Sequence, residues 1–211
     1  MNPKDEIARL RRQLEQARKD TETREAELRR YQQQLEEANA KLREMATTDP
    51  LTGVANRRVF DMRLNVDFAH ARRYERSMAV MMLDVDNFKQ RNDRFGHDEG
   101  DMTLKRLAAL LARGVREADL VVRYGGEEFV LLLPETDENQ ALQMSNRILA
   151  MVRGYEWGHE QLTISGGIAE LHPSVVRPHE LVTRADMALY AAKRAGKDRI
   201  IGWTGIGSAA Q

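Results

Sequence analysis

The sequence RYGGEEF, residues 123–129, places Glu127 and Glu128 in a predicted hairpin turn between two apolar runs that are typical of buried strands. Adjacent carboxylates repel each other unless a cation lies nearby. Another apolar run ends in Asp84 and Asp86. If that strand lies beside the hairpin, up to four carboxylates gather at one end of a sheet. Because such a cluster is costly without a cation, the pattern predicts a cation site.

The chemistry expected of this cluster is the binding of a nucleotide through a metal ion. Mg²⁺ prefers hard oxygen ligands and is usually held by one or two carboxylates together with substrate phosphates, and Mn²⁺ is an alternative ion. Because Gly125 and Gly126 carry no side chain, a bulky ligand can approach the backbone of the turn. Taken alone, a Gly-Gly turn is only a hairpin and Asp84 only a polar residue at a strand end. The interpretation therefore depends on their joint occurrence.

The composition narrows the class of protein. The 211 residues suffice for one ordinary domain with an appendage, and 33 basic residues balance 33 acidic ones. A net charge of zero argues against a nucleic-acid coat or a broadly basic membrane surface, so neither partner is expected. Because the chain has no cysteine, a disulfide framework and a thiolate zinc site are excluded. With a charged N-terminal stretch and no apolar run of membrane length, we expect a soluble cytoplasmic protein.

The N-terminal part has the pattern of a coiled coil. Residues 7–45 form an unbroken heptad register without Pro or Gly, whose core positions are Ile7, Leu10, Leu14, Ala17, Thr21, Arg24, Leu28, Tyr31, Leu35, Ala38, Leu42 and Met45. The single apolar seam predicts a rod on the order of 60 Å long that self-associates, most simply as a parallel dimer. Thr21 and Arg24 either only fix register and oligomer state or mark a weak point where a regulator acts. The first interpretation is the simpler one.

Asp49-Pro50 ends this register, and a mixed pattern of helices and strands follows. Helices are expected at 57–74, around Phe88 and Lys89, and at 98–115, 138–153 and 179–195, and strands at 79–83, 119–122, 129–134, 162–169 and 199–203. This order indicates an α/β sandwich, in which one sheet carries helices on its faces. We expect a stalk helix at 1–47, a catalytic domain at 48–203 and a disordered tail at 204–211.

Several blocks between Thr48 and Trp203 resemble the GGDEF family, the diguanylate cyclases. GGEEF is a variant of its signature, and the other matching blocks are DPLTGVANRRVF, LDVDNFKQRNDRFGHDEGD, LTISGGIAE and ADMALYAAKRAGKDRI. The chain departs from the family at AGKD, where Gly-Arg-Asn is common, so Lys197 must supply the basic contact and Asp198 is less expected. In SGGIA, a second glycine replaces a commoner apolar residue. The resemblance implies a central, mostly antiparallel sheet flanked by helices, of the nucleotidyl-cyclase or palm-like type.

The resemblance also implies roles for single residues. Asp84, the backbone carbonyl of Val85 and Glu127 correspond to metal ligands, with Glu128 as a further ligand or as the proton acceptor. The positions implied to bind GTP are Asn87, Phe88, Lys89, Asn92, Asp101, Gly125, Gly126, Lys193 and Lys197. Asn92 and Asp101 would read the guanine edge, because an amide and a carboxylate match its donors and acceptors. The three lysines would neutralise the triphosphate. Singly, Lys89 could be solvated, and Asn92 and Asp101 could be ordinary caps.

The reaction implied by the resemblance joins two GTP molecules into cyclic di-GMP and releases two pyrophosphates. The 3′-hydroxyl of one GTP attacks the α-phosphorus of the other, with Mg²⁺ assisting. Each domain holds one GTP, so two domains must face each other. A homodimer through the stalk would raise their effective concentration.

READ, residues 116–119, is separated from Gly125 by five residues, the spacing of the family's inhibitory site for its product, cyclic di-GMP. Arg116 would bind a phosphate or guanine and Asp119 a guanine edge, with Arg147 as a second arginine. The alternative is a helix-end arginine followed by a turn aspartate.

Two other functions stay open at this point. The domain could bind nucleotide or product without turnover, although the intact Asp84, Glu127 and Glu128 argue against this. Alternatively, the rod could be the main function and the protein a scaffold. The sequence shows no sensor domain, so a regulatory protein that docks on the rod is the obvious candidate for an activator.

Overall fold

The structure is a computed structural model that describes residues 15, 18, 24, 27, 29–36 and 47–204. The chain divides into two compact units, Met1–Met45 and Ala46–Gln211. In the first unit, the described residues 29–36 are helical, and the seam residues Tyr31 and Leu35 are 67% and 63% exposed. The remaining predicted seam positions except Arg24 lie outside the described residues. Of the tail predicted to be disordered, 204–211, only Thr204 is described, and it is helical.

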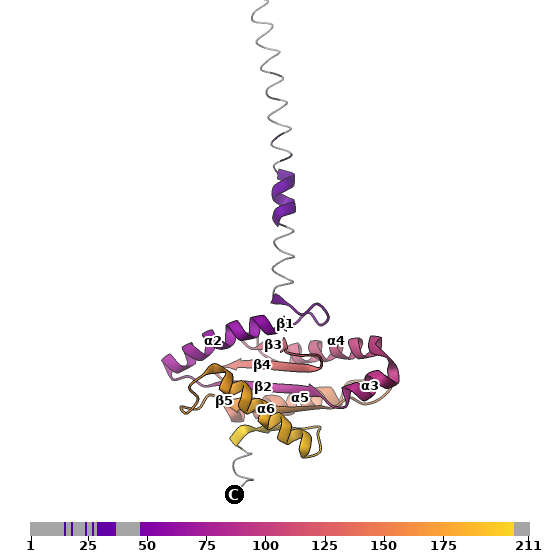
Figure 1. Ribbon diagram of the computed structural model, residues 1–211, viewed down its shortest axis with the longest axis vertical. Coiled ribbons are helices and arrows are strands. Elements are labelled where there is room, and N and C mark those ends of the chain that lie inside the picture. The colour runs from indigo at the N-terminus through magenta and orange to yellow at the C-terminus, as the bar shows by residue number, and fades with distance from the viewer. Residues whose placement is uncertain are drawn as a thin grey trace, which may run out of the picture. The chain divides into compact units, whose positions relative to one another are not determined.

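The second unit is built on one sheet (Figure 1). Its strands are β1 (Ala55–Asn56), β2 (Met78–Val85), β3 (Leu120–Arg123), β4 (Glu128–Pro134), β5 (Ile164–Glu170) and β6 (Ile200–Gly202). They lie in the order β1-β3-β4-β2-β5-β6. The four central strands pair with one another in antiparallel fashion, whereas β1 pairs in parallel with β3 and β6 in parallel with β5 at the two edges. The expectation of a mostly antiparallel sheet is therefore confirmed.

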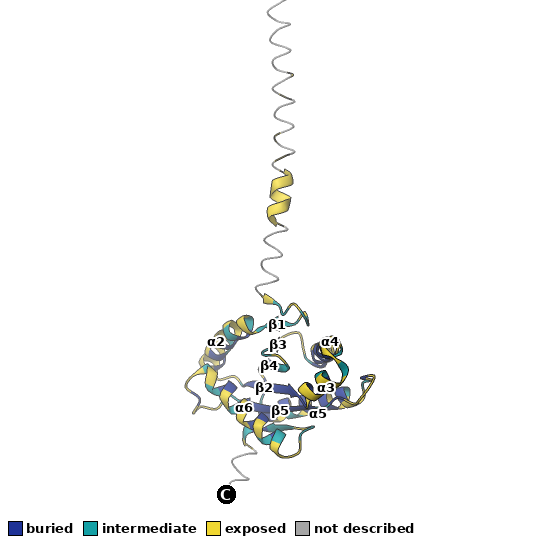
Figure 2. Ribbon diagram, turned by 45° about the vertical axis from the view of Figure 1, so that its right-hand side comes forward, coloured by how far each residue is buried: buried dark blue, intermediate teal, exposed yellow. Residues whose placement is uncertain are grey.

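Helices cover both faces of this sheet. They are α2 (Arg57–Tyr74), α3 (Phe88–Phe95), α4 (His97–Gly114), α5 (Glu138–Arg153) and α6 (Pro178–Arg194). Side chains of α4 and α5 contribute to one hydrophobic core, and side chains of α2 and α6 contribute to the other. The central strand β2 is buried along its whole length, because alternate residues enter the two cores. Figure 2 shows the buried strands between helices whose outer faces are exposed.

The predicted elements differ from the observed ones mainly at their ends. The helices expected at 57–74 and 138–153 have these bounds in the structure. Each has a side-chain N-cap, Asn56 for α2 and Asp137 for α5, the second as a full capping box. The predicted strands at 162–169 and 199–203 both begin later, at Ile164 and Ile200. No helix in the described part of the chain is long and apolar enough to cross a membrane.

Candidate functional site

The predicted acidic residues meet where β2 ends beside the hairpin of β3 and β4. Antiparallel pairing puts Asp84 opposite Glu128. The backbone N–H of Val85 donates to the carbonyl of Glu127 at 3.3 Å. Two segments that lie far apart in sequence therefore bring three carboxylates to one end of the sheet.

Two carboxylates of this group, Asp84 and Glu127, are partly buried and so have lost part of their hydration. Burial raises the pKa of Asp84, although Lys193 opposes the shift through an ion pair of 2.8 Å between Nζ and Oδ1. Burial, and after it the charge of Asp84, raises the pKa of Glu127. Lys193, on the last turn of α6, thus places one positive charge of the protein itself beside these carboxylates.

The donor set fits a divalent cation that binds together with a nucleotide. In the described part of the chain, no three carboxylate or imidazole side chains converge closely enough to hold a metal on their own. A Cβ at Gly125 would overlap the carboxylate of Glu128, so this carboxylate lies against the Gly-Gly turn. Because Mg²⁺ commonly takes only one or two carboxylates and completes its shell with phosphates and water, Asp84 and Glu127 suffice for it.

The fourth predicted acidic residue, Asp86, has other partners. Its Oδ1 accepts from Ser165 Oγ at 2.7 Å, and its Oδ2 accepts from Thr163 Oγ1 at 2.8 Å and from the backbone N–H of Asp198 at 3.1 Å. A carboxylate that accepts these three hydrogen bonds ties β5 and the α6–β6 loop to the end of β2. The expectation that Asp86 joins the cation-binding group is therefore corrected.

Arg123, the first residue of RYGGEEF, fixes the turn itself. Its Nε and Nη2 donate to the carbonyl of Gly126 at 3.2 and 2.8 Å, and its Nη1 donates to both carboxylate oxygens of Asp49 at 3.1 and 3.2 Å. Burial raises the pKa of Asp49, but hydrogen bonds from Thr52 and Arg123 outweigh it and hold that pKa below its usual value. The sequence pattern assigns no role to Arg123, and only its place at the start of the motif could have indicated one.

Asn92 and Asp101, the predicted guanine-reading residues, stand on the neighbouring helices α3 and α4. Asn92 Oδ1 is buried and has no hydrogen-bond partner. It lies against Gly100, where an added Cβ would overlap it. A buried acceptor without a partner is costly, so a ligand that donates to it is favoured. Asp101 is exposed.

Arg91 holds these two helices together and was not predicted. Its side chain is 6% exposed, and its Nε donates to Thr103 Oγ1 of α4 at 3.1 Å. Its two terminal nitrogens donate to the carbonyls of Glu160 and Trp157 at 3.0 and 3.1 Å. A buried guanidinium with this many acceptors locks the helix that presents Asn92. An arginine on the buried face of α3 was the signal available in the sequence.

The predicted phosphate contacts come from three elements. Besides Lys193 on α6, Lys197 in the α6–β6 loop donates to Asn87 Oδ1, and Lys89 is exposed in the first turn of α3. The side chain of Phe88 is buried in the core, so only its backbone is available to a ligand. Glu128 and Lys193 also line a hollow of about 460 Å³, whose lining does not include Asn92 or Asp101.

The READ segment forms a turn after α4. The backbone N–H of Arg116 donates to Asp119 Oδ2 at 2.8 Å, and Arg116 is exposed. Arg147 of α5 donates from Nη2 to the carbonyl of Gly114 at 2.6 Å, beside this turn. The three residues predicted for the inhibitory site therefore lie around one end of α4.

Known proteins match most of this chain. The model of the family described as "Diguanylate cyclase, GGDEF domain" matches residues 46–199. Diguanylate cyclase DgcP of Pseudomonas aeruginosa is 41% identical over 162 residues, which are 75% of this chain and 24% of that protein. The chain spans less than half the length of the curated relatives it matches.

Two solved structures extend the similarity toward the N-terminus. The coiled coil and GGDEF domain of DgcB from Caulobacter crescentus, in complex with c-di-GMP, matches with a TM-score of 0.79 and 32% identity over 86% of this chain and 98% of that one. Diguanylate cyclase SiaD of Pseudomonas aeruginosa, in complex with its activator SiaC, matches with a TM-score of 0.71 and 35% identity over 94% of this chain and 78% of that one.

Proposed function

Because this chain belongs to the GGDEF family, we propose that it is a diguanylate cyclase, which joins two GTP molecules into cyclic di-GMP and releases two pyrophosphates. The similarity to curated cyclases such as DgcP supports this activity. The observation that carries the proposal is the group at the end of β2, where the 6% exposed Asp84 lies beside Glu127 and pairs with Lys193, next to a turn that contains Gly125 and Gly126.

Asp84, Glu127 and the backbone carbonyl of Val85 would hold Mg²⁺, which polarises the α-phosphate and lowers the pKa of the attacking 3′-hydroxyl when bound. Glu128 is either a further ligand or the group that accepts the hydroxyl proton. Lys193 would exchange part of its pairing with Asp84 for phosphate oxygens, and Lys197 and Lys89 would neutralise the rest of the triphosphate.

The base of GTP would lie between α3 and α4. Asn92 Oδ1, which lacks a partner in the protein, would accept from the N–H groups on the guanine edge. The carboxylate of Asp101 would accept from the same edge. Adenine presents a different pattern of donors and acceptors, so ATP is expected to be a poor substrate.

The active species would be a homodimer. Each domain binds one GTP, and the 3′-hydroxyl of one must reach the α-phosphorus of the other. The similarity to a coiled coil with a GGDEF domain in DgcB supports dimerisation through the stalk, and the exposed Tyr31 and Leu35 offer apolar surface for it. Domains joined by short linkers meet at an effective concentration in the millimolar range.

Regulation would act through the product and through a second protein. We expect cyclic di-GMP to bind at Arg116, Asp119 and Arg147 and to inhibit synthesis. The complex of DgcB with c-di-GMP supports binding of the product by this kind of domain. The complex of SiaD with its activator SiaC supports a regulatory protein as a partner, which we propose acts on the stalk.

The direct test is incubation of the full chain with GTP and Mg²⁺, followed by chromatographic separation of the products. Cyclic di-GMP and pyrophosphate are expected in a ratio of about one to two, from the stoichiometry of a symmetric condensation of activated nucleotides. Mn²⁺ is expected to replace Mg²⁺, and a chelator to stop the reaction. If a dimer verified by sedimentation bound GTP without making product, the alternative of a binding module would replace this proposal.

A further inference from the structure

The loop between α6 and β6 carries Lys197 on a backbone that ordinary residues rarely adopt. Gly196, Lys197 and Asp198 have φ values of 109°, 62° and 45°. The left-handed region suits glycine, whereas residues with a Cβ are strained there and remain so only where surrounding contacts hold them. Two such residues in succession therefore point to contacts that fix this loop.

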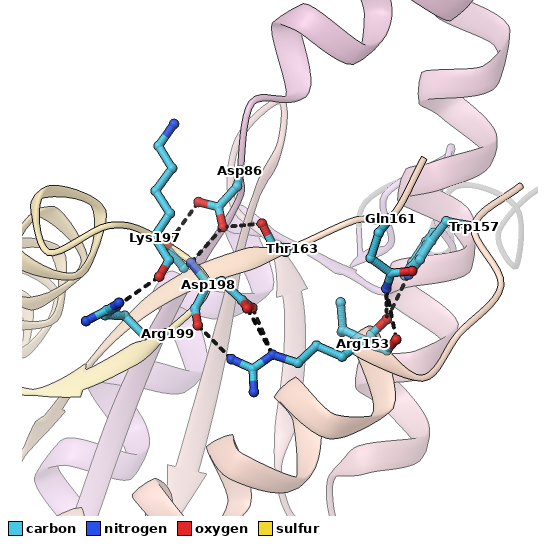
Figure 3. A network of polar contacts seen from close by, with 10 residues as sticks. Asp86, Arg153, Trp157, Gln161, Thr163, Lys197, Asp198 and Arg199 are labelled. Atoms are coloured by element: carbon cyan, nitrogen blue, oxygen red, sulfur yellow. Dashed lines mark hydrogen bonds and ion pairs between the residues drawn. The ribbon is translucent and has the colours of Figure 1, made fainter. Parts of the chain in front are cut away.

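Arg153, the last residue of α5, provides most of these contacts (Figure 3). Its Nε lies 3.0 Å from each carboxylate oxygen of Asp198, and its Nη2 donates to the carbonyl of Asp198 at 2.8 Å. Asp86 accepts from the backbone N–H of Asp198, and Arg199 Nε donates to the carbonyl of Lys197 at 2.9 Å. The side chain and both backbone polar groups of Asp198 are thus held.

Arg153 is itself firmly placed. The carbonyl of Val152 accepts from Trp157 Nε1 at 2.8 Å, and the carbonyl of Arg153 accepts from Gln161 Nε2 at 2.9 Å. These side chains cap the end of α5, where backbone carbonyls lack helical partners. The backbone from which the Arg153 side chain extends is therefore held in place at the end of α5 (Figure 3).

The loop places Lys197 where the proposed function expects the phosphates of GTP. Its Nζ donates to Asn87 Oδ1, just after the end of β2. Asp198 stands where the family commonly has Asn, and both residues tolerate the left-handed region. Asp adds a negative charge beside the phosphate contact, and the guanidinium of Arg153 neutralises it.

We propose that Arg153 and Asp198 form a strap that holds Lys197 toward the phosphates of the bound nucleotide. Arg153 is the positioning residue and Lys197 the residue that contacts the ligand. The strap rests on the proposed function, because it takes GTP as the ligand of this site. An exposed ion pair by itself adds little to stability, and Arg153 and Asp198 are 50% and 38% exposed. Breaking the strap should therefore leave the fold intact and change phosphate binding.

The test compares two probes by calorimetry in Mg²⁺: the non-reactive α,β-methylene analogue of GTP, and GMP, which lacks the outer phosphates. Arg153→Ala is expected to weaken binding of the triphosphate analogue about five- to tenfold, because Lys197 loses its position and the Asp198 carboxylate is left unneutralised. Binding of GMP is expected to change less than about twofold, since its base site on α3 and α4 is untouched. Arg153→Lys keeps the positive charge but loses the planar guanidinium with its several donors, so its affinity for the analogue should lie between those of wild type and Arg153→Ala.

A rescue variant and a control sharpen the test. In the double variant Arg153→Ala/Asp198→Asn, the neutral amide removes the repulsion but does not restore the position of Lys197, so only part of the lost affinity should return. Arg63→Ala breaks an exposed ion pair with Asp67 on α2 and should bind both probes as wild type does.

Two results would overturn the strap alone: equal binding of the analogue by Arg153→Ala and wild type, or equal losses for both probes. If Arg153→Ala fails to fold, the same comparison is made with Arg153→Lys, and unchanged binding there overturns the strap. A wild-type protein that binds neither probe overturns the proposed function, and the strap with it.

Discussion

At the scale of single residues, the chemistry of the site depends on how much water each charge has lost. Burial raises the pKa of Asp84 and of Glu127, so a cation gains more from binding them than from binding exposed carboxylates. The ion pair with Lys193 already offsets part of the cost of burying the charge of Asp84. Asn92 Oδ1 is the equivalent feature at the base site, because its lack of a partner favours a ligand that donates a hydrogen bond.

The first prediction concerns Glu127. Glu127→Gln keeps the size of the side chain but removes its charge, and it relieves the repulsion with Asp84. We expect the fold to stay intact and synthesis of cyclic di-GMP to fall by about a hundredfold or more, because a metal ligand is lost. Initial rates and a thermal unfolding curve would be measured together. Near-native turnover would remove Glu127 from the proposed metal site.

The second prediction concerns Gly100. Gly100→Ala puts a methyl group where Asn92 Oδ1 now lies, so the amide must move. We expect kcat/KM with GTP to fall by a factor that corresponds to about 1 to 3 kcal/mol, and the preference for GTP over ATP to narrow. Met102→Ala, an exposed change on the same helix, is the control. An unchanged preference for GTP would show that Asn92 does not select guanine.

The third prediction concerns the product site. Arg116 is exposed beside the turn closed by Asp119, so Arg116→Ala should not disturb the fold. Product inhibition is expected to weaken, while initial rates stay close to those of wild type. Rates measured across a series of added cyclic di-GMP would test this. The same inhibition curve for both proteins would mean that READ only ends a helix.

At the scale of elements, the site is assembled by side chains that bridge neighbouring segments. Arg123 joins the hairpin turn to Asp49 in the first turn of the domain. Arg91 joins α3 to α4, and Asp86 joins β2 to β5 and to the loop after α6. These bridges are charged or polar because they end at backbone N–H and C=O groups, hydroxyls and a carboxylate, which an apolar contact would leave unsatisfied.

The fourth prediction concerns the bridge from Asp49. Its pKa is lowered in the folded protein, so its carboxylate adds stability that is present above its unfolded pKa and lost as the pH falls through its folded pKa. Asp49→Asn should therefore lower the free energy of unfolding by about 1 kcal/mol at neutral pH, and the difference from wild type should shrink in acid. Urea unfolding at several pH values would measure it. A difference that does not depend on pH would contradict the role of the charge.

At the scale of the whole molecule, the chain has two units, to which the proposed function gives different tasks. The second unit carries all the described groups of the proposed site, and the first carries the heptad register. Since the proposed reaction needs two domains, the first unit would act by bringing them together, by setting their angle, or by both. A seam with polar groups at Thr21 and Arg24 suits the second role, because it could change packing at small energetic cost.

The fifth prediction separates tethering from control of the angle. Deleting residues 7–45 should lower activity at dilute protein, and raising the concentration should restore it if the stalk only tethers. If the stalk also sets the angle, concentration alone will not restore the rate. An insertion of four residues should then change activity while the dimer, checked by sedimentation, persists. Full activity of the truncated protein at the lowest concentration would exclude both roles.

Much of the fold and part of the site could be predicted from the sequence, because both depend on local patterns. The sequence pattern predicted α2 and α5 with their observed bounds, and two apolar runs on either side of turn residues predicted the hairpin that carries Glu127 and Glu128. The ends of weaker elements, such as β5 and β6, were misplaced by one or two residues because no cap marks them.

The partners of the charged side chains were decided only by the tertiary structure. Arg123 bonds Asp49 across 74 residues, Arg153 bonds Asp198 across 45, and Asp86 accepts from the backbone of Asp198 across 112. A sequence pattern shows that a residue is charged and which face of its element it occupies, but a charge in a sequence has many possible partners. Packing of the sheet and its helices selects one of them, because only a few acceptors come within hydrogen-bond distance and burial makes an unpaired charge costly.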